Sequence, residues 1–378
     1  MGQNIKNKFL NKKIIIFMPS IEGGGVEKNL FIVTNYLAAR IKNLSLISIS
    51  KKYKKKFHKS VNFVTLSSNF WDNLGRKIKY ILSIFLLIKL FLKDRNVVVL
   101  AFQANIYCIL ICKIFFVKII TRSNTAPIGW SKNFIKKILF KFFLNLSDEI
   151  IVNSLEFKKD LKKELNLKSV CIYNPLNFSE IVKKSKSKSK KIFKHGKLKI
   201  INIGRFTEQK DQITLLRALN IIKKKINFEM IIVGRGVLKE KLLNFIKLNN
   251  LSRNVKIINF VENPFPLIKQ SDLFILSSKY EGLPNVLLET LALKKFIISS
   301  DCRTGPKEIL LNGKGGLLFK IGNYHQLANQ IIYFNNHKRN CKKLLKKSTK
   351  ALNRFDYKIN LKKYYQLIQQ IDTTSQEY

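Results

Sequence analysis

Short apolar runs alternate with helix-like segments along the first half of the chain. The apolar runs cover residues 13–20, 44–50, 61–66, 97–102, 117–122 and 149–154. Between them, apolar residues recur with helical spacing at 29–39, 78–92, 105–116 and 132–146. Continuous apolar strands that alternate with helices predict a parallel sheet with helices on both of its faces.

The same alternation restarts in the second half of the chain. Strand-like runs lie at 199–206, 228–234, 255–260, 272–278 and 296–301, with helical segments at 212–224 and 238–249. A chain of 378 residues is long enough for two cores. The pattern therefore predicts an α/β fold with two doubly wound, Rossmann-like domains. The carboxyl ends of their strands are expected to face a shared cleft in which ligands bind.

A lysine- and serine-rich stretch over 183–197 separates the two halves. It contains eight lysines, three serines and no acidic residue. Because like charges repel and serine packs poorly, this stretch predicts a solvated linker or loop. The expected organisation is an amino-terminal domain over 1–182, the linker, a carboxy-terminal domain over 198–350, and an amphipathic helical segment over 351–378. That last segment could pack back across the domain junction.

Two apolar stretches bear on membrane insertion. The run at 14–18 ends in Pro19 and a glycine cluster, so it lacks the apolar core of a signal peptide and is expected to be a strand. The run at 78–92 is shorter than the roughly 20 residues that span a bilayer, and Lys79 and Lys89 interrupt it. A buried or interfacial helix is expected there.

The formal net charge of +48 predicts attraction to anionic surfaces. Phospholipid, nucleic acid and nucleotide phosphates all qualify, and the charge does not choose among them. A composition biased toward Lys, Asn, Ile and Phe explains part of the excess equally well. An apolar content of 46% argues against disorder.

The five cysteines form no paired CxxC or Cys/His pattern, so neither a disulfide framework nor a zinc site is predicted. Cys108 and Cys112 lie one helical turn apart in an apolar run, which is typical of a core. A reducing cytosol is therefore expected. The four histidines are expected at the surface, outside the motifs described below: His58, His195, His325 and His337.

Three glycines, Gly23, Gly24 and Gly25, follow the first predicted strand and open a helix. Their backbone N–H groups could approach a phosphate or an acceptor closely. The spacing lacks the full dinucleotide fingerprint, so NAD binding is not supported. A tight turn without a ligand remains an equal alternative.

Arg205 and Lys210 follow the first strand of the second half, after Gly204. Two cations at this place could neutralise a diphosphate leaving group, although a solvated loop would also contain such a pair. Gly234 and Gly236 end the next strand, where a base or ribose could rest against bare backbone.

The segment 278–290, SKYEGLPNVLLET, places Glu281 in a turn and Glu289 inside the helix that follows. A helix start offers unpaired N–H groups and positive dipole charge that hold phosphate, and nearby carboxylates can hold sugar hydroxyls. Two glutamates also occur on solvated helix faces. Gly282 and Pro284, followed by apolar residues, favour a fixed position for Glu281 and suit a nucleotide-sugar.

These motifs, in this order, resemble the retaining glycosyltransferases of family four, whose two-Rossmann-domain architecture is called GT-B. The resemblance covers nearly the whole chain and rests on the glycine loop at 23–25, Arg205 with Lys210, the Gly234 loop, and the E-x7-E signature of Glu281 and Glu289. The block over 277–310 is most similar to members that build lipopolysaccharide, capsule or lipid-linked oligosaccharides.

The resemblance implies a role for each motif. Arg205 and Lys210 would hold the donor diphosphate, Glu281 would contact the donor sugar, and Glu289 would bind the ribose hydroxyls. The substrate-binding set that it implies is Gly24, Gly25, Gly204, Gly234, Gly282, Leu283, Pro284, Asn285 and Glu289. The donor would be a nucleotide-sugar, expected to be a UDP-sugar, carrying a hexose or an N-acetylhexosamine. The acceptor would be a lipid-linked or lipopolysaccharide-type glycan.

The family usually needs no metal, and no DxD-like motif is evident here, so a metal-independent enzyme without a cofactor is expected. Arg205, Lys210 and the helix start can supply the positive charge. One departure concerns a histidine that many relatives carry in the amino-terminal domain. This chain has Arg122, Ser123 and Asn124 there, so histidine catalysis is not carried over.

The helix over 132–146 combines lysines with aromatic residues. Its apolar positions share one face: Phe134, Ile135, Ile138, Leu139 and Phe142. Lysines occupy the other side. We hypothesise that this helix and the lysines near 76–95 dock the amino-terminal domain on the anionic, cytoplasmic face of the inner membrane. A core helix with a solvated lysine face is the alternative.

Two other functions fit parts of the pattern. A basic nucleic-acid-binding protein would explain the charge, but no basic-aromatic module appears and no nucleic acid is expected as a partner. A sugar-nucleotide epimerase of the same architecture would convert its donor without an acceptor.

Overall fold

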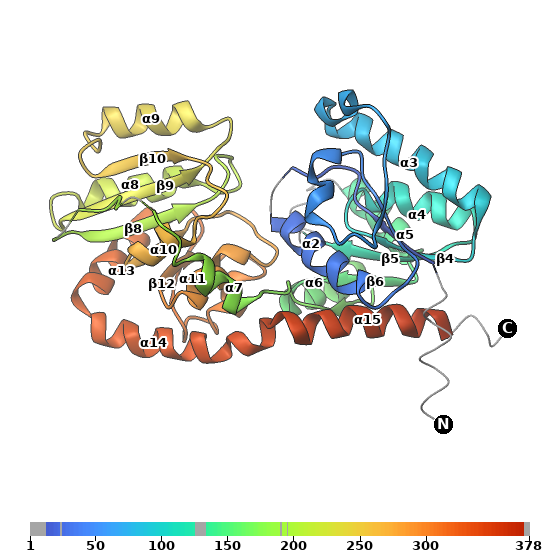
Figure 1. Ribbon diagram of the computed structural model, residues 1–378. Helices are drawn as coiled ribbons and strands as arrows, with labels where there is room; N and C mark the ends of the chain where they lie inside the picture. The colour runs from blue at the N-terminus through green and yellow to red at the C-terminus, as the bar shows by residue number, and fades with distance from the viewer. Residues whose placement is uncertain (1–12, 23–24, 125–133, 190, 195, 374–378) are drawn as a thin grey trace. The chain divides into compact units, whose positions relative to one another are not determined.

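The computed structural model describes residues 13–22, 25–124, 134–189, 191–194 and 196–373. The chain forms two compact units. Unit 1 comprises Met1–Pro175 and Tyr357–Tyr378, and unit 2 comprises Leu176–Asp356. Each unit is a parallel sheet with helices on its faces (Figure 1). The predicted pair of doubly wound α/β domains is confirmed.

In its described part, unit 1 contains a sheet in the order β3-β2-β1-β4-β5-β6-β7. The strands are β1 (Lys13–Phe17), β2 (Leu44–Ile47), β3 (Asn62–Val64), β4 (Val97–Ala101), β5 (Lys118–Ser123), β6 (Glu149–Val152) and β7 (Val170–Cys171). All five residues of β4 are buried, as the continuous apolar run predicts for a central parallel strand. Every neighbouring pair is parallel, so the carboxyl ends of the strands lie at one edge.

Two helical layers cover the sheet of unit 1. One core contains residues of α2 (Gly25–Ala38) and α15 (Tyr357–Thr373), and the other contains residues of α3 (Arg76–Lys93), α4 (Asn105–Ile114), α5 (Phe134–Asn145) and α6 (Leu155–Leu165). Short 3-10 helices span Lys51–Lys56 and Asn69–Asn73. Cys108 and Cys112 are buried in the second core, as predicted.

The sheet of unit 2 has the order β10-β9-β8-β11-β12-β13. Its strands are β8 (Leu198–Ile203), β9 (Phe228–Gly234), β10 (Val255–Asn259), β11 (Leu273–Leu276), β12 (Phe296–Ser300) and β13 (Leu317–Phe319). Its helices are α7 (Phe178–Lys184), α8 (Gln212–Ile222), α9 (Lys239–Leu248), α10 (Phe265–Gln270), α11 (Asn285–Ala292), α12 (Pro306–Ile309), α13 (Tyr324–Asn336) and α14 (Lys338–Lys350). A 3-10 helix over Ala351–Phe355 follows α14.

The chain passes from unit 1 to unit 2 between Pro175 and Leu176, before the predicted linker over 183–197. Lys183 and Lys184 end α7, and Ser187 and Ser189 hydrogen-bond to side chains of unit 2. The lysine-rich stretch therefore begins as part of unit 2, because α7 and these serines anchor it there.

The chain returns to unit 1 through α15, which packs beside α2 (Figure 1). Leu361, Tyr364 and Ile368 of α15 are buried in the unit 1 core. The amphipathic pattern of the carboxy-terminal segment is explained by this packing, since its apolar stripe covers one face of the first sheet.

No helix in the described ranges is both long enough and apolar enough to cross a bilayer. The apolar run at 78–92 lies in α3, which buries Leu87 and Phe91 against the sheet. Lys79 is also buried, and its ammonium donates to the carbonyl oxygen of Asp72 at 2.8 Å. Burial lowers the pKa of Lys79.

Candidate active site

The order of strands in the unit 2 sheet reverses direction between β8 and β11. The chain places β9 and β10 on one side of β8, and then β11, β12 and β13 on the other. The loops that leave the carboxyl ends of β8 and β11 therefore diverge at this point. Open parallel sheets bind ligands at such a switch point. The two loops contain Arg205 with Lys210 and Glu281 with its neighbours.

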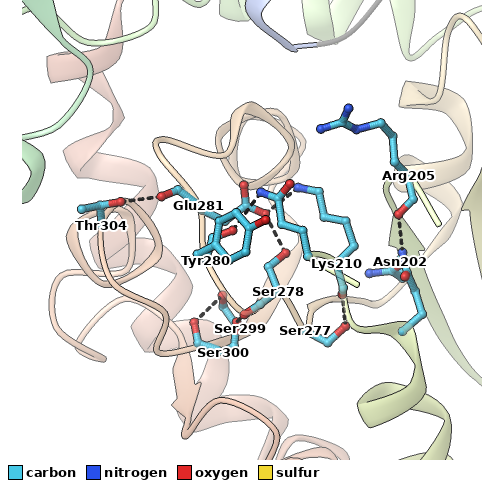
Figure 2. A network of polar contacts seen from close by, with 12 residues as sticks. Asn202, Arg205, Lys210, Ser277, Ser278, Tyr280, Glu281, Ser299, Ser300 and Thr304 are labelled. Carbon is cyan, nitrogen blue, oxygen red and sulfur yellow. Dashed lines mark hydrogen bonds and ion pairs between the residues drawn. The ribbon is translucent and has the colours of Figure 1, made fainter. Parts of the chain in front are cut away.

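A buried ion pair joins these two loops. The Lys210 ammonium lies 2.5 Å from Oε1 of Glu281, and the Ser278 hydroxyl donates to the same oxygen at 2.6 Å (Figure 2). The two charged side chains are 16% and 8% exposed. Because both side chains are largely withdrawn from solvent, removal of either would leave the other without a charged partner.

Three further hydrogen bonds hold the same two loops together. The Ser277 hydroxyl donates to the carbonyl oxygen of Lys210 at 2.9 Å. The amide of Lys279 donates to the Gln209 carbonyl at 2.8 Å, and the Gln209 side-chain amide donates to the Tyr280 carbonyl at 3.0 Å. The position of the ion pair is therefore fixed by backbone contacts as well as by its own charges.

The segment after β12 supports Glu281 from a third strand. The Thr304 hydroxyl donates to the Glu281 carbonyl at 2.6 Å, and the Ser300 hydroxyl donates to the Ser278 carbonyl at 2.6 Å. Cys302 is buried beside them. Burial, with a smaller contribution from the negative charge of Glu281, raises the pKa of the Cys302 thiol to about 12. This thiol is therefore a poor nucleophile at neutral pH.

Glycines allow the backbone of these loops to pack closely. The stem of Lys210 lies 3.5 Å from the place that a Cβ on Gly204 would occupy. A Cβ on Gly234 would lie 1.9 Å from the Gly204 carbonyl oxygen, and one on Gly236 would lie 2.4 Å from that of Phe206. The Gly204 loop fills the space into which a side chain at position 234 would project. That a base or ribose rests against the bare Gly234 backbone stays a prediction.

Arg205 differs from Lys210 in its surroundings. Its side chain is exposed, while its carbonyl oxygen accepts from the Gln212 side chain at 3.1 Å. In Figure 2 its guanidinium points away from the serines that surround Glu281. Of the two cations that the sequence brings to this loop, one is ion-paired and the other faces solvent.

Helix α11 begins at Asn285. The residue before it, Pro284, has a φ angle of −71°. Leu283, Asn285 and Glu289 are buried. Glu289 lies one turn inside the helix, on the same face as Asn285. Gly282 connects Glu281 to this helix start, so all the residues predicted over 281–289 belong to one loop and helix.

In unit 1, Gly25 begins α2, while residues 23–24 lie outside the described residues. Just before them, Glu22 forms an ion pair with Arg76 and accepts from the Ser20 hydroxyl at 3.2 Å. The hydrogen bond with Arg76 lowers the pKa of Glu22. A charged cluster thus lies beyond the carboxyl end of β1.

Arg122 lies in the segment where the family resemblance implied a histidine, and it is buried. Its guanidinium donates to the Tyr364 hydroxyl at 2.8 Å, to Asn174 at 2.6 Å and to Asn124, and it lies 5.2 Å from the centre of the Phe102 ring. Burial raises the pKa of Tyr364. With 1% of its surface exposed, Arg122 connects β5 to α15 instead of facing a substrate.

Sequence reasoning left the serines and the threonine of the unit 2 cluster without a role. Ser277, Ser278, Ser300 and Thr304 all lie at or just beyond the carboxyl ends of β11 and β12. Small polar residues that directly follow an apolar strand could have identified them in the sequence. Ligand sites of parallel sheets form at the carboxyl ends of the strands, where such residues lie.

Among the described residues, no three His, Cys, Asp or Glu side chains come together as a metal site would require. His58, His325 and His337 are exposed, as predicted, and His195 lies outside the described residues.

The fold and this cluster define a two-unit α/β protein with a charged site at the switch point of its second sheet. Residues 183–351 match the family model described as "Glycosyl transferases group 1". This match covers most of unit 2. The predicted GT-B architecture is confirmed by the solved structures that resemble the chain.

Two curated relatives and one solved structure illustrate the similarity. An uncharacterized glycosyltransferase of Methanocaldococcus jannaschii is 37% identical over 222 residues, which cover 53% of each chain. The N-acetylgalactosamine-N,N'-diacetylbacillosaminyl-diphospho-undecaprenol 4-alpha-N-acetylgalactosaminyltransferase of Campylobacter jejuni is 28% identical over 55% of this chain and 58% of its own. The chain thus spans little more than half the length of these relatives. HepE of Anabaena, crystallised with UDP, has a TM-score of 0.74 and 17% identity over 94% of this chain and 99% of its own.

Proposed function

We propose that the protein is a retaining glycosyltransferase of family four that transfers a hexose or N-acetylhexosamine from a UDP-sugar to a lipid-linked glycan. The observation that carries this proposal is the buried Lys210–Glu281 pair at the switch point of a glycosyltransferase group 1 domain. The UDP bound to HepE supports a uridine nucleotide, and the diphospho-undecaprenol in the name of the Campylobacter relative supports a lipid-linked acceptor.

The cluster suits a donor that carries both a diphosphate and a sugar. Arg205 faces solvent and can meet the diphosphate first, and Lys210 can turn from Glu281 toward the incoming phosphates. Glu281 would then accept a hydrogen bond from a hydroxyl of the sugar, while Glu289 on α11 would accept from the ribose hydroxyls. Positively charged groups aimed at a developing phosphate charge lower the barrier without a metal.

The proposed chemistry needs no protein nucleophile. The bond between the anomeric carbon and the diphosphate breaks, and UDP departs with its electron pair. The acceptor hydroxyl bonds to the same carbon on the face that UDP vacates, and its proton passes to the departing phosphate oxygen. The protein mainly positions the reactants and neutralises the leaving group.

We expect acceptor-dependent UDP release from one member of a panel of UDP-sugars, incubated with extracted lipid-linked glycans. Mass spectrometry of the lipid product should show one added hexose or N-acetylhexosamine. An isomerised UDP-sugar formed without acceptor would instead identify an epimerase. If no UDP-sugar releases UDP but another nucleotide-sugar releases its own nucleotide, the assignment of uridine is wrong and the assignment as a transferase holds.

We also propose that unit 1 docks on anionic membrane through α3, α4 and α5. Helix α4 packs against both of the others. Their outward side chains form an exposed apolar surface: Ile78, Ile81, Phe85 and Leu92 of α3, Tyr107, Leu110 and Ile114 of α4, and Ile135, Ile138, Leu139 and Phe142 of α5. Exposed lysines, including Lys77, Lys89 and Lys141, lie among them. Apolar groups with interspersed lysines suit the headgroup region of an anionic bilayer.

Flotation with liposomes tests this docking. Wild type is expected to float with anionic vesicles, less so at high salt, and only weakly with neutral ones. The variant Ile138→Ser/Phe142→Ser should lose most of this binding, because each serine removes roughly 2 kcal/mol of apolar burial. The matched control Val237→Ser/Leu248→Ser, at exposed apolar positions of unit 2, should float as wild type does. Equal flotation with anionic and neutral vesicles would contradict the proposal.

A further inference from the structure

Unit 2 contains a cavity at the sheet edge opposite the Lys210–Glu281 pair. Its volume is about 500 Å³, and its walls come from the start of β8, the start of β12, the residue before β11, and helices α13 and α14. Because every strand pair of this sheet is parallel, these walls lie at the amino-terminal ends of the strands. Lys210 and Glu281 follow the carboxyl ends, so the cavity is separate from the proposed donor site.

The side chains that line the cavity carry mostly positive charge. Its lining includes five lysines, which are Lys197, Lys294, Lys295, Lys338 and Lys342. The single carboxylate in the lining is Asp272, and its Oδ2 accepts from the backbone amide of Lys199 at 3.0 Å. Within the described part of the chain, none of the five ammonium groups forms an ion pair. The cavity therefore presents five lysine side chains against one carboxylate.

Two of these lysines are partly removed from water. The Lys338 ammonium lies 3.7 Å from the centre of the Phe334 ring, which stacks on Phe296 at 5.0 Å. Burial lowers the pKa of both Lys295 and Lys338, and the charge of Asp272 only partly offsets the effect. An anion in the cavity would stabilise both ammonium groups, since it would replace the solvent that they have lost.

Helix α14 adds a second source of positive potential. It begins at Lys338, and the residue before it, His337, makes no side-chain hydrogen bond to cap the helix start. Lys338, Cys341 and Lys342 of its first turns line the cavity. The free N–H groups and the dipole of a helix start favour negative charge.

We propose that this cavity binds a compact polyphosphate, either inorganic triphosphate or the phosphate chain of a nucleoside triphosphate. Five lysines and one aspartate require an anion with several charges in a small volume. Lysine, as a flexible point charge, suits phosphate oxygens in many orientations. The volume lies within the roughly 300–1,000 Å³ of ordinary small-ligand sites, so a nucleotide also fits by size.

Calorimetric titration of the full chain with inorganic triphosphate, in magnesium-free buffer at physiological ionic strength, tests the proposal. The variant Lys295→Gln/Lys338→Gln should bind triphosphate at least about tenfold more weakly than wild type. The matched control Lys343→Gln/Lys346→Gln removes the same charge from exposed positions on α14 outside the cavity and should stay within about twofold. If both variants weaken triphosphate binding equally, the proposal is overturned, because the binding would then depend on the net charge of the protein and not on the cavity.

Two further variants separate binding from folding and from the donor site. Lys294 has φ +55°, a conformation that glycine adopts without strain, so Lys294→Gly should preserve or raise the melting temperature while it weakens triphosphate binding. Lys210→Gln should leave triphosphate binding unchanged. If this variant loses triphosphate binding, the triphosphate binds at the donor cluster and the proposal is refuted. Weaker binding of ATP than of triphosphate assigns the cavity to inorganic polyphosphate, and tighter binding assigns it to a nucleotide.

Discussion

Replacement of Glu281 by glutamine is expected to lower the rate of sugar transfer by at least about a hundredfold while the fold persists. Glutamine retains an oxygen that can accept from both Lys210 and Ser278, so the local hydrogen bonds survive. It lacks the negative charge that pairs with the Lys210 ammonium and that would bind a sugar hydroxyl strongly. The measurement is UDP release at saturating donor, with circular dichroism to verify the fold.

Replacement of Lys210, the partner of Glu281, provides a control for this experiment. Lys210→Met should abolish transfer and also lower the free energy of unfolding by about 3 kcal/mol or more, because Glu281 is left buried without its partner. Lys279→Met removes a lysine from the neighbouring loop whose exposed side chain lies 3.4 Å from Glu208, and should change stability by less than about 1 kcal/mol. Near-normal turnover of Glu281→Gln would contradict the proposed role of the glutamate.

Most strands of both sheets were predictable because parallel strands between helical layers are apolar at every position. Val97–Ala101 and Leu273–Leu276 are entirely buried and stand out in the sequence for this reason. Val170–Cys171 and Leu317–Phe319 are edge strands of two and three residues, and all their side chains except that of Phe319 are partly exposed. Such short segments have no periodic pattern, and only their neighbours in the sheet define them.

The charged residues of the candidate cluster stand out in the sequence, but the groups that they contact do not. Arg205 and Lys210 were both expected to hold a diphosphate, whereas the structure pairs Lys210 with a glutamate 71 residues away. That contact exists only because β11 lies beside β8, and the strand order is not encoded in either loop. Lys79 shows the same limitation. The lysines near 76–95 were expected to dock on an anionic membrane, whereas the Lys79 side chain is buried and donates to the Asp72 carbonyl oxygen.

Gly305→Ala is expected to lower the free energy of unfolding of unit 2 by about 3 kcal/mol or more and to abolish transfer. Gly305 has φ +83°, and a Cβ on it would lie 2.1 Å from the Gly282 carbonyl oxygen and 2.7 Å from Cδ of Pro284. Both contacts belong to the loop that connects Glu281 to α11. The added methyl group must therefore displace this loop, and the carboxylate would move with it.

Gly313→Ala separates the steric clash from the cost of the backbone conformation. Gly313 has φ +86°, almost the same as Gly305, but nothing lies within 4 Å of the place that its Cβ would occupy. Its replacement should cost only about 1–2 kcal/mol and leave transfer unchanged. Unfolding by urea should be followed by circular dichroism, because Trp71 and Trp130, the two tryptophans, both precede unit 2 in the chain. If both alanine variants unfold at the same urea concentration, the contact between Gly305 and Gly282 does not hold the Glu281 loop in place.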